Sequence, residues 1–126
     1  DDLDAARRFY DALLTPLGLE RREMNPDGGA VGLCWRRPGE RTPWFFVFQP
    51  YDGRPASAGN GTMAAFLAPS EEAVRAAYAA ATIAGGRCEG PPGERAHYAP
   101  GYYGAYLRDP AGNKVHVVHR GDLAAT

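Results

Sequence analysis

The order of the predicted elements repeats once along this 126-residue chain, and that repeat constrains its fold more than any other feature. Residues 61–126 predict a strand, a helix and three further strands. Residues 1–60 predict a helix and three strands in the same order, so we take the opening strand of this first module to be absent from the sequence. One helix over each sheet predicts an α+β fold of two strand–helix–three-strand modules, not a doubly wound α/β fold. We expect the two modules to form one compact domain whose sheets curl around a cup.

Both helices are predicted from apolar residues at helical spacing and from the residues at their ends. The first begins after the N-cap Asp2, and its regular part ends near Pro16, because proline disrupts an α-helix. The second covers residues 71–84, with Ser70 as its N-cap and the glycine pair 85–86 as its end. The apolar positions of each helix form one stripe, which we expect to pack on a sheet.

Three strands are predicted in the first module. Leu19–Met24 is short and charged, and it leads into a turn at residues 25–29. Ala30–Arg36 alternates between apolar and other residues. Trp44–Gln49 is a continuous run of mostly aromatic and β-branched residues, which predicts a strand covered on both sides. Residues 50–61 are rich in Gly, Pro, Ser and Asn and predict a loop between the modules.

The second module closes with a predicted hairpin. Tyr102–Arg108 and Lys114–His119 are strand candidates, and Asp109–Asn113 between them has the composition of a tight turn. Arg87–Glu89 is predicted to be a short strand, and Gly90–Gly93 is predicted to be a proline–glycine loop.

Charge and hydropathy argue against several classes of function. Fourteen basic residues oppose fifteen acidic ones, and the longest basic runs are single pairs, so no basic face for nucleic acid is predicted. No apolar stretch approaches the ~20 residues of a membrane helix, and the chain opens on two acidic residues rather than a secretory leader. Cys34 and Cys88 are too few for a disulfide scaffold. We expect both to be reduced and buried, as in a cytoplasmic protein.

Three segments carry a resemblance to a known family. They are residues 2–20 (DLDAARRFYDALLTPLGLE), 61–70 (GTMAAFLAPS) and 97–118 (HYAPGYYGAYLRDPAGNKVHVV). In this order the chain resembles the glyoxalase/bleomycin-resistance/dioxygenase (vicinal oxygen chelate) superfamily. The resemblance implies paired modules around a cup. It also implies that metal-dependent members hold a divalent ion there, with one ligand from the first and one from the last strand of each module.

The family's ligand positions are carried over residue by residue. The first strand of module one would precede Asp1, and the last strand of that module offers Phe45 or Phe46. The position that opens module two is Met63, and the final strand offers His116. A thioether and a phenyl ring are not ligands for a first-row divalent ion, so the resemblance predicts no family metal site, with His116 as the one candidate metal ligand.

Aromatic residues on the predicted strands suggest a different use of the cup. By alternation Tyr102 and Tyr106 share one face of their strand, and one such set of rings is expected to line the concave face. We therefore predict a ligand-binding set on that face and at its rim: His116, Met63, Tyr102, Tyr106, Phe46 and His97.

Other interpretations of the histidines remain open. His116 is either a hydrogen-bonding or acid–base group for a ligand, or a packed histidine bonded to the backbone or to a tyrosine. His97 either closes the cup or only pins its loop, and His119 is predicted to be a solvated strand end.

These residues lead to one expected function and two rivals. We expect a protein that binds a small organic molecule in an aromatic-lined cup without a metal, as the bleomycin-resistance branch does. The rivals are a metal-dependent lyase, isomerase or dioxygenase that uses His116 and an unseen upstream ligand, and an interaction module whose cup is filled by its own side chains. An exposed sheet edge left by the missing strand favours a homodimer.

Overall fold

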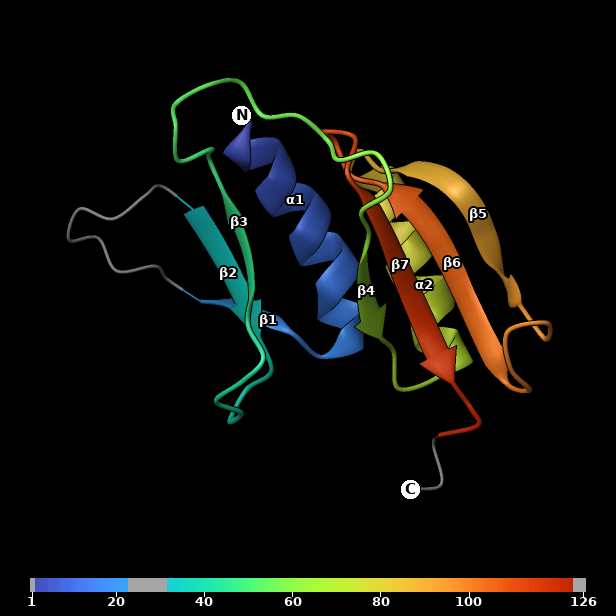
Figure 1. The fold of residues 1–126 in the computed structure, drawn as a ribbon. Helices are drawn as coiled ribbons and strands as arrows, with labels where there is room; N and C mark the ends of the chain where they lie inside the picture. Colours follow the sequence, from blue (N-terminus) through green and yellow to red (C-terminus); the bar gives the residue numbers. More distant parts are fainter. Residues whose placement is uncertain (1, 23–31, 124–126) are drawn as a thin grey trace.

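The computed structural model describes residues 2–22 and 32–123, which form two helices and two sheets (Figure 1). The first half contains α1 (Leu3–Leu14), the 3₁₀ turn η1 (Thr15–Leu17), β1 (Glu20–Arg22), β2 (Gly32–Arg36) and β3 (Phe45–Phe48). The second half contains β4 (Ala64–Leu67), α2 (Glu71–Ile83), β5 (Arg87–Glu94), β6 (Tyr102–Arg108) and β7 (Lys114–Arg120). The predicted α+β order of elements is therefore confirmed.

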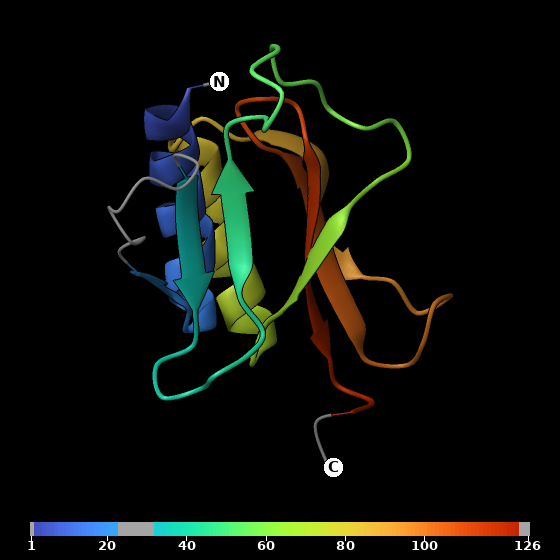
Figure 2. The ribbon, with the colours of Figure 1, turned by 60° about the vertical axis from the view of Figure 1, so that its left-hand side comes forward.

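Each half contributes one sheet. The first sheet has the order β1-β2-β3 and is antiparallel throughout, whereas the second has the order β4-β7-β6-β5, in which β4 runs parallel to β7. Figure 1 shows the two sheets next to each other, with the edge strands β3 and β4 nearest to one another and α2 behind β7 and β6. In the turned view of Figure 2, α2 lies to one side of β7 and β6. The open sides of both sheets are thus left free of helices.

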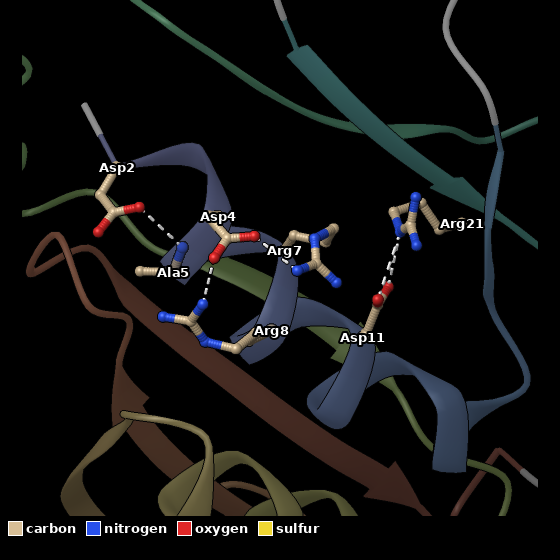
Figure 3. Close-up of polar contacts among 7 residues, drawn as sticks. All are labelled: Asp2, Asp4, Ala5, Arg7, Arg8, Asp11 and Arg21. Carbon is tan, nitrogen blue, oxygen red and sulfur yellow. Dashed lines mark hydrogen bonds and ion pairs between the residues drawn. The ribbon is translucent and has the colours of Figure 1, made fainter.

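The first helix is fixed by its cap and by surface charges. Asp2 accepts a hydrogen bond from the backbone N–H of Ala5 at 2.9 Å, as the sequence predicts for an N-cap. Further along, Asp4 pairs with both Arg7 and Arg8 on the exposed side of the helix (Figure 3). Figure 3 also shows Asp11 facing Arg21 of β1, whose Nε lies 3.1 Å from the carboxylate.

The core lies between the helices and the sheets. Tyr10 of α1 is 2% exposed and packs against Trp35 and Phe45, with ring centroids 5.6 and 5.0 Å away. The indole N–H of Trp35 donates to Asp11 at 3.0 Å, so burial of this ring leaves no polar atom unsatisfied. On α2, the buried stripe consists of Val74, Ala77 and Ala81, which pack in the same core.

A buried hydrogen bond joins the two halves. The hydroxyl of Tyr10 donates to Asp109 in the β6–β7 turn at 2.6 Å. The other oxygen of Asp109 accepts from the backbone N–H groups of Ala111 and Asn113, which fixes the predicted turn. Asp109 is only 4% exposed, and these donors compensate for the burial of its charge.

Two strand predictions are wrong. β5 extends through both prolines to Glu94, although a loop is predicted at Gly90–Gly93. Because β5 is the edge strand, its proline nitrogens need no ladder partner, and register shifts around Gly90 take up the irregular backbone. β3 is not covered on both sides, since Phe46 and Phe48 are 46% and 45% exposed while Phe45 and Val47 pack on the core.

Some predictions fall outside the described residues. Met24 and the turn at 25–29 lie there, so only Glu20–Arg22 of the first predicted strand is seen. In the described part of the chain, neither helix has the length and apolar character needed to cross a bilayer.

Candidate ligand-binding site

One face of the second sheet carries three stacked rings. Tyr106 and His116 are register partners on β6 and β7, and their rings lie nearly parallel with centroids 4.0 Å apart. The ring of Tyr102 is also nearly parallel to that of His116, with centroids 5.8 Å apart. The intervening Tyr103 points to the opposite side, where its hydroxyl accepts a hydrogen bond from Arg75 of α2. We call the face away from α2, with Tyr102, Tyr106 and His116, the open face of the second sheet.

His116 is held in one tautomer. Its Nδ1 lies 2.9 Å from the carbonyl oxygen of Ala105, and a carbonyl can only accept, so Nδ1 carries the proton. Nε2 is then the acceptor for the hydroxyl of Tyr102 at 2.8 Å. Gly104 makes room for the ring, because a Cβ at this position would lie 2.6 Å from Cε1 of His116.

Burial and nearby charges keep His116 neutral. The imidazole is 2% exposed, and burial is the largest cause that lowers its pKa from the ordinary 6.5. The positive charges of Arg95 and Lys114 lower the pKa further, while the hydrogen bond to Ala105 acts in the opposite direction. At neutral pH, His116 is therefore an uncharged acceptor for Tyr102.

Tyr106 lies among cations. The guanidinium of Arg95 and the ammonium of Lys114 lie 5.7 and 5.2 Å from the centre of its ring. Burial raises the pKa of Tyr106 to about 12, and a hydrogen bond with Tyr98 contributes to this rise. The phenol thus stays protonated at neutral pH and is engaged with Tyr98.

The first sheet carries an aromatic ladder on its own open face. Trp44, Phe46 and Phe48 stack in succession, with centroids 5.9 and 5.6 Å apart and nearly parallel rings. They point away from α1, and Arg36 of β2 lies over Trp44 at 4.8 Å. Gly32 is required beneath Phe48, since a Cβ there would lie 2.4 Å from the ring.

Two cavities lie where the sheets approach each other. One of about 410 Å³ is lined by Phe46 of the first sheet and by Met63 next to β4, together with the buried ring of Tyr10. A neighbouring cavity of about 330 Å³ is lined by Met63, Arg108 and Lys114. Met63 and Lys114 line both cavities, so the two adjoin each other, and the larger one is also lined by the polar residues Asp109 and Asn113.

The predicted site residues do not all gather at one point. Tyr102, Tyr106 and His116 form one cluster, and Phe46 and Met63 line the larger cavity. His97 is exposed in the loop after β5 and contacts Tyr98 at 4.2 Å between ring centroids. Tyr98 in turn packs edge-on against Tyr102 at 5.1 Å, so the loop joins the cluster through Tyr98.

Two minor predictions are wrong. His119 is not a solvated strand end, because it is half-buried and its Nδ1 lies 3.1 Å from the carbonyl oxygen of Ala68. Cys88 is exposed on the edge strand β5, whereas Cys34 is buried as predicted. Both cysteines are free thiols.

Sequence reasoning missed several residues of this region. Alternation puts Lys114 on the same face as His116, but the predicted binding set does not include Lys114. Arg95 could not, because the register shifts in β5 determine where its side chain lies relative to Tyr106. The contact between Tyr10 and Asp109 spans 99 positions and leaves no local signal.

The described residues do not fit the metal ion that metal-dependent members of this fold hold. Among residues 2–22 and 32–123, no three side chains of His, Cys, Asp and Glu are grouped to hold a metal. Both ring nitrogens of His116 are already engaged, and Met63 and Phe46 offer no hard donor. A first-row divalent ion needs three or four protein ligands, and this set supplies at most one.

Two curled-sheet modules, each with one helix packed on one face, define a paired-module α+β protein, and the comparisons with known proteins identify its family. A family model described as the Glyoxalase/Bleomycin resistance protein/Dioxygenase superfamily matches residues 1–117. The chain belongs to this superfamily. No curated protein sequence matches the chain.

Solved structures agree with this assignment. A glyoxalase/bleomycin resistance protein from Albidiferax ferrireducens T118 is 40% identical, with a TM-score of 0.79 over 95% of this chain and 91% of that one. A lactoylglutathione lyase from Agrobacterium tumefaciens is 26% identical, with a TM-score of 0.60 over 98% of this chain and 88% of that one. A glyoxalase-related enzyme from Fulvimarina pelagi shares the fold at 19% identity, with a TM-score of 0.67 over 94% and 81% of the two chains.

Proposed function

We propose that this chain binds a small organic molecule between its two open faces and does so without a metal ion. The observation that carries the proposal is the cluster of Tyr102, Tyr106 and His116, which lies on the face that no helix covers. The aromatic ladder of Trp44, Phe46 and Phe48 gives the first sheet a similar surface. Aromatic walls with a few polar groups are typical of sites for flat organic ligands.

Hydrogen-bonding capacity at this site supports binding of a polar aromatic molecule. The hydroxyl groups of Tyr102 and Tyr106 lie in the cluster, and the neutral His116 fixes the orientation of Tyr102. A ligand that stacks on the rings can take the place of Tyr98 as the hydrogen-bond partner of Tyr106, whose pKa is raised to about 12 and which therefore stays protonated. None of these interactions requires a metal.

Titration calorimetry with 2-naphthamide, a neutral planar probe, tests the proposal. We expect saturable binding to the wild-type protein, and we expect Tyr106→Leu to weaken it about tenfold, because a ring contact is removed. Tyr51→Leu is the matched control, since Tyr51 is fully exposed in the loop between the modules. Equal loss of binding in both variants would contradict the assigned site.

A second candidate function is a metal-dependent lyase, isomerase or dioxygenase, which the similarity to a lactoylglutathione lyase favours. It would require Nε2 of His116 to release Tyr102, and it would require further ligands from outside the described residues. Titration with Zn²⁺, Ni²⁺ and Fe²⁺ separates the two functions. Stoichiometric submicromolar binding that disappears in His116→Gln would replace the metal-free proposal with the enzymatic one.

A further inference from the structure

We propose that the molecule bound between the open faces is a planar organic anion. This inference rests on the proposed function and adds the charge and shape of the ligand. The geometry behind it is two cations beside the Tyr106 ring of the second sheet and a third beside the aromatic ladder of the first sheet.

The second sheet contributes two cations without acidic partners. Arg95 and Lys114 both lie within 6 Å of the centre of the Tyr106 ring, and neither forms an ion pair with any described residue. Arg95 donates only to the carbonyl oxygen of Pro91, which carries no net charge. Within the described part of the chain, the positive charges around Tyr106 are therefore not neutralised by an ion pair of their own.

The neighbouring Arg108 and Arg120 differ from Arg95 and Lys114, because each of the two arginines forms an ion pair with a carboxylate. Arg108 donates to Glu89 at 2.6 Å, and Arg120 forms a two-point pair with Asp122 at 2.6 and 2.9 Å. These two acids are thus already engaged and cannot fully compensate Arg95 or Lys114. The pKa of Glu89 is lowered chiefly by its hydrogen bond from Arg108, and the charge of Lys114 lowers it further.

The first sheet contributes a third cation of the same kind. Arg36 lies over Trp44, and its buried Nε has no hydrogen-bond partner among the described residues. Glu20 is its register partner on β1, but the Glu20 carboxylate pairs with Arg22 at 3.5 Å. An uncompensated guanidinium thus lies beside the aromatic ladder of this sheet as well.

The cavities match an anion that has an apolar body. The larger hollow is lined by Phe46, Met63 and Lys114, and also by Asp109, whose carboxylate already accepts hydrogen bonds from Tyr10 and from the turn. The adjoining hollow of about 330 Å³ is lined by Met63, Lys114 and Arg108. A flat ring can lie against the aromatic surfaces while a carboxylate approaches Lys114. A cationic ligand in these hollows would meet Lys114 instead, and we infer that the site disfavours it.

The test compares three probes that share one ring system: 2-naphthoate, 2-naphthamide and 2-naphthylmethylammonium. Calorimetric titrations at low salt are carried out on the wild type and on Lys114→Gln, Arg95→Gln and Arg75→Gln. Arg75→Gln is the matched control, because it removes the same charge on the α2 side of the second sheet. Thermal unfolding of each variant shows that it is folded.

We expect 2-naphthoate to bind about tenfold more tightly than 2-naphthamide, because charge-assisted hydrogen bonds are stronger than neutral ones. This preference should shrink several-fold in Lys114→Gln and Arg95→Gln, persist in Arg75→Gln and weaken with added salt.

Two results overturn the inference alone: equal or tighter binding of the neutral or cationic probe, and an anion preference that survives loss of Lys114 and Arg95. In either case binding itself remains, and the proposed function stands. Failure of all three probes to bind the wild-type protein overturns the proposed function together with the inference.

Discussion

At the scale of single residues, the place of His116 on β7 explains why its imidazole is fixed in one orientation. Its neighbours Val115 and Val117 are buried on the side of α2, which directs the imidazole to the other face. There the carbonyl of Ala105 and the hydroxyl of Tyr102 satisfy both nitrogens. The neutral form is therefore built into the folded state, and protonation has to break a hydrogen bond.

The stability of the protein should therefore depend on pH through His116. The pKa of His116 is lowered in the folded state, so below the ordinary value of 6.5 the unfolded chain binds more protons than the folded one. The contribution of neutral His116 to the free energy of unfolding is therefore fully present above pH 6.5. It declines as the pH falls toward the pKa that His116 has in the folded protein. We expect the free energy of unfolding to drop between pH 7 and pH 5, as measured by urea denaturation.

His116→Gln provides the comparison for that measurement, since glutamine does not titrate. Its unfolding free energy should vary less with pH over the same range than that of the wild type. A pH dependence identical in the two proteins would show that another group titrates.

At the scale of elements, the helix ends follow local chemistry. Ser70 accepts a hydrogen bond from the backbone N–H of Ala73 at 3.0 Å and begins α2 as predicted. Glu71 and Glu72 in the first turn add favourable charge at this end of the helix. Such caps depend only on residues close in the sequence.

Removing this cap should destabilise the protein without affecting the open faces. We expect Ser70→Ala to lower the free energy of unfolding by about 1 kcal/mol, because one N–H at the start of α2 loses its partner. Ser70→Asp should retain most of the stability, since a carboxylate can accept the same bond. Equal stability of Ser70→Ala and the wild type in thermal unfolding would rule out this role.

The elements that could be predicted are those with local signals. The turn at Asp109–Asn113 has its own hydrogen bonds, and alternation correctly separates Tyr102 from Tyr103. The strand at Arg87–Glu89 could be predicted, but its extension to Glu94 could not be, because whether a strand tolerates prolines depends on its being at the edge of a sheet. The exposure of Phe46 likewise depends on which strands lie beside β3.

At the scale of the whole molecule, the contact between Tyr10 and Asp109 couples the two halves. Burial is the largest cause that raises the pKa of Tyr10, followed by the negative charge of Asp109 and their hydrogen bond. The phenol therefore remains a donor at all ordinary pH values. This single contact ties α1 to the hairpin of the other module.

Loss of this contact should weaken the whole fold. We expect Tyr10→Phe to lower the free energy of unfolding by about 1–3 kcal/mol, since a buried carboxylate loses a donor. Tyr51→Phe is the control, because its hydroxyl is fully exposed. Combining Tyr10→Phe with Asp109→Asn should cost less than the sum of the single changes, and strict additivity would argue against the coupling.

The sheets also leave strand edges open. Among the described residues β3 pairs only with β2 and β4 pairs only with β7, and exposed edges favour pairing with another chain. We predict a homodimer, with a mass of twice 13.6 kDa in light scattering. Phe48→Lys should shift the equilibrium toward monomer, because a lysine on an edge strand disfavours pairing. A wild-type mass of one chain at micromolar concentration would contradict the prediction.

The positions of the two tryptophans give the protein a built-in optical reporter. Trp35 is 1% exposed in the core, whereas Trp44 is 39% exposed on the open face of the first sheet. A soluble quencher such as acrylamide should quench the fluorescence of Trp44 and leave that of Trp35 unchanged. The emission of Trp44 should therefore report ligand binding, and that of Trp35 should report unfolding. When a ligand is titrated into the protein, the decrease in quenching of Trp44 by acrylamide then reports ligand binding without any attached dye.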